Sequence, residues 1–85
     1  MSETDQISGR QIAAARALAG IGQEALAKSA DISVPTLRRM EASDGPASGL
    51  PNNVRAVKQA LEAAGLIFVA ENGEGPGVRL RKTYK

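Results

Sequence analysis

Apolar residues recur at helical spacing in three short stretches of the first half of the chain. Each stretch has its own start signal: Ser8 followed by Gln11 fits a capping box, Gly22 is a permissible N-cap, and Ser33 is a capping residue followed by Pro35 in the first turn. These patterns predict amphipathic helices. The predicted helices run from Ser8 to about Ala19, from Gln23 to Ala30, and from Ser33 to about residues 40–42.

A further helix is predicted after a loop. Residues 43–51 read S-D-G-P-A-S-G-L-P, which is a loop by composition. The next helix begins near Asn52 or Asn53 and ends before Gly65. Its apolar residues recur on one face, at Val54, Val57, Leu61 and Ala64.

The end of the chain has the pattern of a β-hairpin. Residues 66–70 read L-I-F-V-A, which is β-prone, and Asn72-Gly73 is a strong turn signal. Residues 78–81 then alternate apolar and basic side chains as a strand does. We therefore predict a mostly α fold of four to five helices with a C-terminal β-hairpin. The predicted parts are a disordered N-terminus (1–7), a helical domain (8–64), and the hairpin with a basic tail (65–85).

The second and third predicted helices have the layout of a helix-turn-helix. Two helices that cross closely need a small residue where they touch, and Ala27 fits that position. The positions that would fix the second helix of the motif against its neighbours are all apolar: Leu26, Ala30, Ile32, Leu37 and Met40. In a helix-turn-helix of this kind, the second helix can enter the major groove of DNA.

At this level of detail, residues 8–64 resemble the Cro/phage-repressor (XRE) class of helix-turn-helix domains. The residues that carry the resemblance are Arg16, Gln23, Ala27, Ile32, Ser33, Leu37, Met40 and Glu41. Asp31 stands in the turn where the family usually has glycine, and aspartate tolerates the left-handed conformation better than most residues. The resemblance implies a repressor-like fold and a sequence-specific regulator of transcription, a repressor, that binds double-stranded DNA.

The resemblance also implies roles for individual residues. Gln23 and Ser33, at the starts of the two helices, would approach phosphates. The second helix of the motif would supply the other DNA-binding residues, with base edges read from Val34, Pro35 and Arg39 and with Thr36 and Arg38 beside them. Arg16 and Glu41 would form a structural ion pair between the first and third helices.

The residues themselves leave a second function open. Val34 and Pro35 offer no side-chain hydrogen bond, so they could touch a thymine methyl group but could not distinguish bases by donors and acceptors. The loop 43–51 contains an acid and no base. The same surface could therefore dock another regulatory protein, as an anti-activator or an antitoxin-like module does. Steep salt dependence of duplex binding would separate the two functions.

The composition of the chain narrows the classes of protein function that remain possible. The chain has no cysteine and no histidine, which excludes disulfides, thiolate chemistry and histidine-based catalysis. No nucleophile–base pair, paired carboxylates or metal-ligand cluster is recognisable, so we expect no enzyme activity, no catalytic residue, no metal and no cofactor. Four of the 11 basic residues lie in 79–85, so the net charge of +2 reflects the tail and not the helical part. The first residues, M-S-E-T-D-Q, are not a signal peptide, and no apolar run is long enough for a membrane span, so a cytoplasmic protein is expected.

The apolar segment 66–70 also bears on assembly. Leu66, Phe68 and Ala70 would lie on one face of a strand, and Ile67 and Val69 on the other. A two-stranded hairpin is marginal alone, and a second apolar face is unfavourable in water on so small a domain. Pairing of the hairpin edge with a second copy would give a C2 homodimer, with recognition helices about 34 Å apart. The alternative is a monomer in which the fourth helix covers the hairpin.

Overall fold

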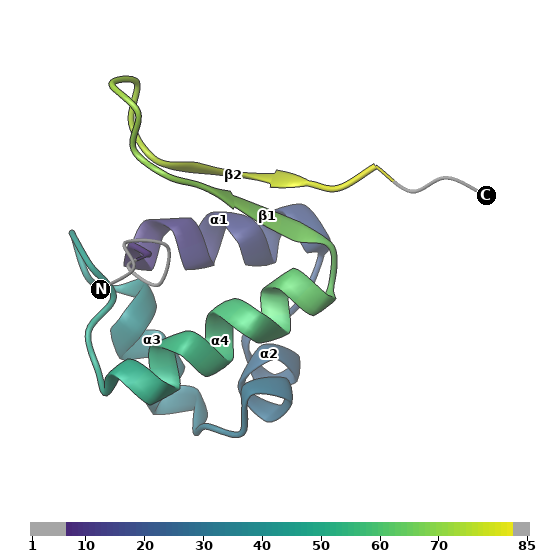
Figure 1. Cartoon of the computed structure of the whole chain (residues 1–85). Coiled ribbons are helices and arrows are strands. Elements are labelled where there is room, and N and C mark those ends of the chain that lie inside the picture. Colours follow the sequence, from purple (N-terminus) through teal and green to yellow (C-terminus); the bar gives the residue numbers. More distant parts are fainter. Residues whose placement is uncertain (1–6, 83–85) are drawn as a thin grey trace.

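The computed structural model describes residues 7–82 and confirms the predicted fold class (Figure 1). A domain of four helices is followed by a two-stranded antiparallel hairpin. The elements are α1 (Gly9–Ala19), α2 (Gln23–Ala30), α3 (Val34–Glu41), α4 (Pro51–Ala63), β1 (Leu66–Val69) and β2 (Gly77–Leu80). Residues 1–6 of the predicted disordered terminus, and Lys85 of the predicted basic tail, lie outside the described residues.

The helix ends follow the capping chemistry of the sequence. The Ser8 hydroxyl accepts a hydrogen bond from the Gln11 backbone, and the Gln11 side chain accepts one from the Ser8 backbone, which completes the capping box. At the end of α2, Asp31 is left-handed, with φ of 59° and ψ of 46°. The residue that replaces the usual glycine of this turn therefore adopts the conformation that the turn needs.

Four element boundaries differ slightly from the prediction: the start of α4, the end of β1 and both ends of β2, which begins at Gly77 and not at Val78. Helix α4 begins at Pro51, not at Asn52 or Asn53, because proline at the first helical position loses no hydrogen bond. The paired strands end at Val69 and Leu80, each one residue before the predicted end. The connection between them spans residues 70–76, longer than a two-residue turn, and within it Gly73 but not Asn72 has a positive φ.

The core collects apolar side chains from all four helices and from the first residue of β1. Ile7, predicted to belong to the disordered terminus, is only 3% exposed, and its carbonyl accepts a hydrogen bond from the Ala47 amide. Ala64, which was predicted to lie on the apolar face of the fourth helix, is exposed at its end. Leu18 of α1 is an apolar residue at helical spacing but is 48% exposed. The buried apolar residues are Ile7, Ile12, Ala15, Leu26, Ala27, Ala30, Leu37, Met40, Val54, Val57, Leu61 and Leu66.

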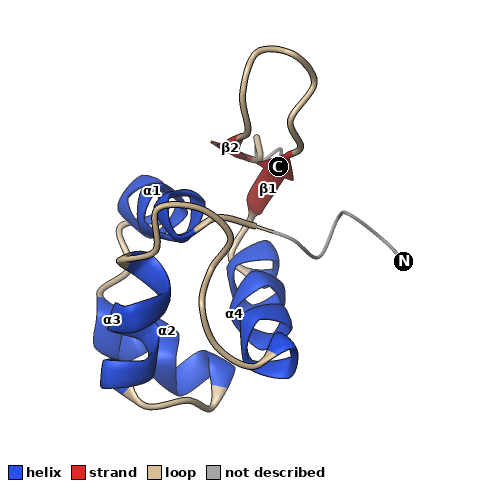
Figure 2. Ribbon diagram, turned by 90° about the vertical axis from the view of Figure 1, so that its left-hand side faces the viewer, coloured by secondary structure: helices blue, strands red, loops and turns tan. Residues whose placement is uncertain are grey.

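The hairpin packs on the helices through one face. Strand β2 lies against α1, and β1 contacts α1 and α4. Gln11, which is 7% exposed, fastens both strands, because its Nε2 donates to the carbonyl oxygens of Gly77 (3.0 Å) and Val69 (3.4 Å). Phe68 and Val78 are paired across the strands and pack against the core. In both views, β2 is the strand farther from α4 (Figures 1 and 2).

No helix in residues 7–82 combines the length and the apolar character that crossing a membrane requires.

Candidate nucleic-acid interface

Helices α2 and α3 form a tight pair joined by the turn at Asp31 (Figure 2). Ala27 is buried in this part of the core, and its carbonyl accepts a hydrogen bond from the Ile32 amide. Leu37 and Met40 hold the inner face of α3 in the core. The opposite face of this short helix is consequently turned outward.

The outward face of α3 carries the residues proposed for DNA contact. Pro35, Arg38 and Arg39 are exposed, and Val34 and Thr36 are half-buried. Ser33 is occupied by its capping role: its hydroxyl accepts from the Thr36 amide at 3.2 Å and is hydrogen-bonded to the Thr36 hydroxyl at 2.8 Å. The side chains of this surface therefore include two arginines, a hydroxyl pair and an apolar tip at the first turn.

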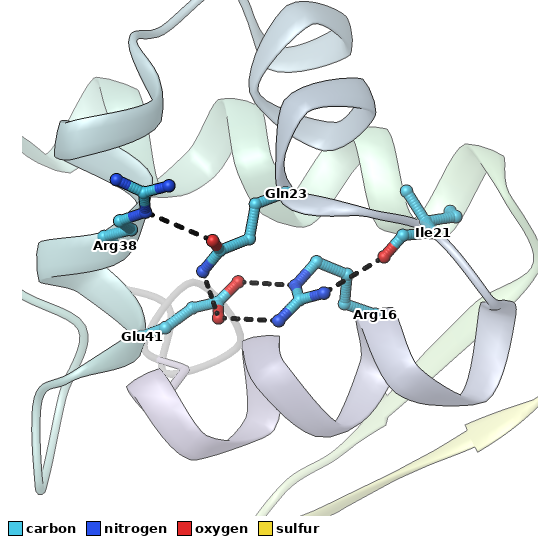
Figure 3. Close-up of polar contacts among 5 residues, drawn as sticks. All are labelled: Arg16, Ile21, Gln23, Arg38 and Glu41. Carbon is cyan, nitrogen blue, oxygen red and sulfur yellow. Dashed lines mark hydrogen bonds and ion pairs between the residues drawn. The ribbon is translucent and has the colours of Figure 1, made fainter.

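Arg16 and Glu41 form the expected ion pair between α1 and α3 (Figure 3). Arg16 Nε lies 2.8 Å from Glu41 Oε2, Nη2 lies 3.1 Å from Oε1, and Nη1 donates to the Ile21 carbonyl at 3.2 Å. The side chains are 24% and 9% exposed. The hydrogen bond to Glu41 raises the pKa of Arg16, against the opposing effect of burial. This bidentate geometry fixes the carboxylate of Glu41.

The fixed carboxylate of Glu41 orients the side chain of Gln23, which in turn accepts a hydrogen bond from Arg38. Gln23 Nε2 donates to Glu41 Oε1 at 3.1 Å, and Arg38 Nε donates to Gln23 Oε1 at 3.3 Å (Figure 3). Because the Glu41 carboxylate can only accept, the amide of Gln23 must turn its NH2 group toward Glu41 and its oxygen toward Arg38. A continuous series of polar contacts, called the polar chain below, therefore runs from the partly buried interior to the surface through Arg16, Glu41, Gln23 and Arg38.

The polar chain leaves the outer edge of the Arg38 guanidinium available. Within residues 7–82, its Nη groups make no hydrogen bond, while Nε is held by Gln23. A guanidinium held at Nε presents two parallel donors, which match a phosphate or the O6 and N7 atoms of guanine. The family resemblance predicts that Gln23 approaches a phosphate, but it does not predict the hydrogen bond between Gln23 and Arg38. The only available signal was that both residues sit near the predicted contact of α2 and α3.

The loop that follows α3 carries an acidic residue, Asp44, near the candidate interface. Asp44 lies 3.2 Å from Arg10 of α1, with side-chain exposures of 92% and 78%. So exposed a pair contributes little to stability, but it balances the loop's acid with a base from α1. Among the described residues, no group of three or more acidic, histidine or cysteine side chains could hold a metal ion.

No protein-family model matches the chain, and no curated protein matches it.

Proposed function

We propose that this chain is a sequence-specific, double-stranded DNA-binding regulator of transcription, a repressor of the Cro/phage-repressor (XRE) type. It would act in the cytoplasm as a homodimer joined through the C-terminal hairpin, without a catalytic role or a cofactor. The observation that carries the proposal is the guanidinium of Arg38, held by Gln23 at the exposed face of α3 with its outer donors available.

In this proposal, α3 lies in the major groove and each of its exposed residues has a separate task. Arg38 binds a phosphate or a guanine through its outer donors, and Arg39, on the same face, reads a base edge. Val34 and Pro35 contact a thymine methyl group. Gln23 and Ser33 lie at the starts of α2 and α3, where the helix dipoles favour a phosphate.

The test is the salt dependence of binding to a duplex carrying DNA from the protein's own promoter region. We expect the affinity of the intact protein to fall steeply with salt, because each phosphate contact releases counterions. Arg38→Ala should lower the slope of log K against log salt by about 1 if Arg38 binds a phosphate. If it reads a guanine, the same substitution should cost about 1–3 kcal/mol on the preferred sequence and less on others. Arg10→Ala, an exposed arginine paired with Asp44, is the matched control and should change neither quantity.

A second function is favoured by the first turn of α3. Pro35 is exposed and Val34 half-buried, and neither side chain can hydrogen-bond to a base. Such a tip beside Arg38 and Arg39 suits a protein-binding module of the anti-activator or antitoxin type. Absence of duplex binding at low salt would select this function. Substitution of Val34, Pro35, Arg38 or Arg39 should then abolish capture of the protein partner in a pull-down.

A further inference from the structure

Strand β2 has an open edge. In the described part of the chain, the sheet has only two strands, so one side of β2 pairs with β1 and the other side has no strand. That second side points away from α4 in both views (Figures 1 and 2). Unpaired strand edges are templates for pairing with another chain.

The hydrogen-bonding pattern of the hairpin identifies which backbone N–H and C=O groups of β2 lie on its open edge. The Arg81 amide donates to the Gly65 carbonyl at 2.7 Å, so the backbone groups of Arg81 face β1. The backbone groups of an antiparallel strand alternate between its two sides, so those of Arg79 and Gly77 also face β1. The N–H and C=O groups of Val78 and Leu80 therefore point to the open edge.

We propose that β2 pairs antiparallel with β2 of a second copy of this chain, in the register that places Val78 opposite Val78 on the two-fold axis. Each Val78 amide then donates to the Val78 carbonyl of the second copy. Each Leu80 amide donates to the Pro76 carbonyl of the second copy. The inference rests on the homodimer of the proposed function and specifies its interface.

Charge disfavours the two registers that are shifted toward the C-terminus. Centring the pair on Arg79 places Arg79 opposite its own copy, and centring it on Leu80 places Arg79 opposite Arg81. Like charges directly opposite each other on one face are destabilising. With Val78 on the axis, Arg79 lies opposite Gly77, which has no side chain. The arrangement therefore pairs a long cation with a glycine.

Apolar exposure is consistent with the same register. Leu80 lies on the face of β2 that also carries Val78, yet it is 49% exposed. In the proposed pairing, Leu80 lies opposite Pro76 of the second copy, so the proline ring can cover it. Because proline has no amide proton, the ladder of hydrogen bonds ends at Pro76.

Disulfide cross-linking can measure the register, because the chain has no cysteine of its own. A hydrogen-bonded pair has Cα atoms about 5.5 Å apart, within the range of about 4.4–6.8 Å that a disulfide spans. Val78→Cys should therefore form a covalent dimer under mild oxidation. An equimolar mixture of Gly77→Cys and Arg79→Cys chains should form a mixed disulfide. A Cβ at Gly77 meets no atom within 4 Å, so this substitution should not perturb the fold.

Two other samples report the competing registers. Arg79→Cys alone would cross-link if Arg79 lay on the two-fold axis. A mixture of Arg79→Cys and Arg81→Cys chains would cross-link if Leu80 lay on the two-fold axis. Either result overturns the proposed register. Sedimentation of the reduced intact chain at tens of micromolar separates the remaining outcomes. A dimer that cross-links in none of the samples uses another register or another surface, and either overturns the proposed pairing. A monomer overturns the homodimer as well. Neither result decides DNA binding, which the salt titration measures separately.

Discussion

A single glutamate organises the polar residues beneath the candidate interface. Glu41 accepts hydrogen bonds from Arg16 and from Gln23, and is the point where α1, α2 and α3 are joined by polar contacts. Its side chain is largely removed from water, so these partners supply the hydrogen bonds that water would otherwise make. The same contacts that stabilise the fold therefore also orient Arg38 at the exposed face of α3.

The first prediction concerns the coupling of Arg16 and Glu41. Arg16→Met and Glu41→Gln should each lower the free energy of unfolding by about 1–3 kcal/mol, because each leaves a partly buried charged partner with fewer hydrogen bonds. The double variant should lose less than the sum, with a coupling of about 0.5–3 kcal/mol in a urea-denaturation cycle. The exposed pair Arg10 and Asp44 is the control and should couple by no more than about 0.5 kcal/mol. Additive losses for Arg16 and Glu41 would contradict the pairing.

At the scale of single residues, some contacts were predictable from the sequence and others were not. The ion pair between Arg16 and Glu41 followed from the family resemblance and is present. The bond between Gln23 and Arg38 joins residues on different helices, and it depends on the helix crossing and on which way an amide is turned. Neither can be derived from spacing along the chain. For the same reason, Gln11 was predicted only as a capping residue, although it also fastens the hairpin.

The packing of elements depends on a close approach between α1 and the end of α3. A Cβ atom at Gly9 would clash with the backbone carbonyl of Met40 and lie 2.8 Å from that of Ser43. Backbone atoms cannot move aside as the end of a flexible side chain can. This position therefore requires glycine for its small size, and not for an unusual backbone conformation.

The second prediction follows from that contact. Gly9→Ala should lower the free energy of unfolding by about 1–3 kcal/mol through overpacking, although alanine is the better helix former. The measurement is a denaturant melt of the purified chain. Gly45→Ala is the matched control, because a Cβ at Gly45 meets nothing within 4 Å, and its effect should stay within about 0.5 kcal/mol. Equal stability of the two variants would show that α1 and α3 are farther apart than the structure has them.

The elements were largely predictable, because their ends carry chemical signals. Ser8, Gly22 and Ser33 were predicted as caps and occupy those positions. The spacing of apolar residues predicted which side chains are buried less reliably than the capping residues predicted the helix ends. Leu18 fits the apolar pattern of α1 but is exposed, whereas Lys58 of α4 is buried, with its ammonium group 3.8 Å from Glu62. A long aliphatic stem can pack in the interior while its charge reaches a partner, which binary patterns do not represent.

At the scale of the whole molecule, the hairpin belongs to the folded domain, and within residues 7–82 one edge of β2 pairs with no strand. Leu66 is fully buried among the helices, and Gln11 holds the strands to α1. On the other face of β1, Ile67 and Val69 remain only half-buried. A rigidly held hairpin that pairs with a second copy would fix the relative orientation of the two α3 helices.

The last prediction tests this fixed geometry on DNA. Two α3 helices related by a two-fold axis should bind a palindromic duplex whose half-sites are about 10 base pairs, roughly 34 Å, from centre to centre. Light scattering of the complex should then give two chains per duplex. Adding five base pairs between the half-sites places them on opposite faces of the helix, so the affinity should fall toward that of a single half-site. Arg38→Ala is the control that weakens binding without changing this spacing preference. Equal affinity for both spacings, with one chain bound per half-site, would mean that the two domains bind independently and that the hairpin does not set their separation.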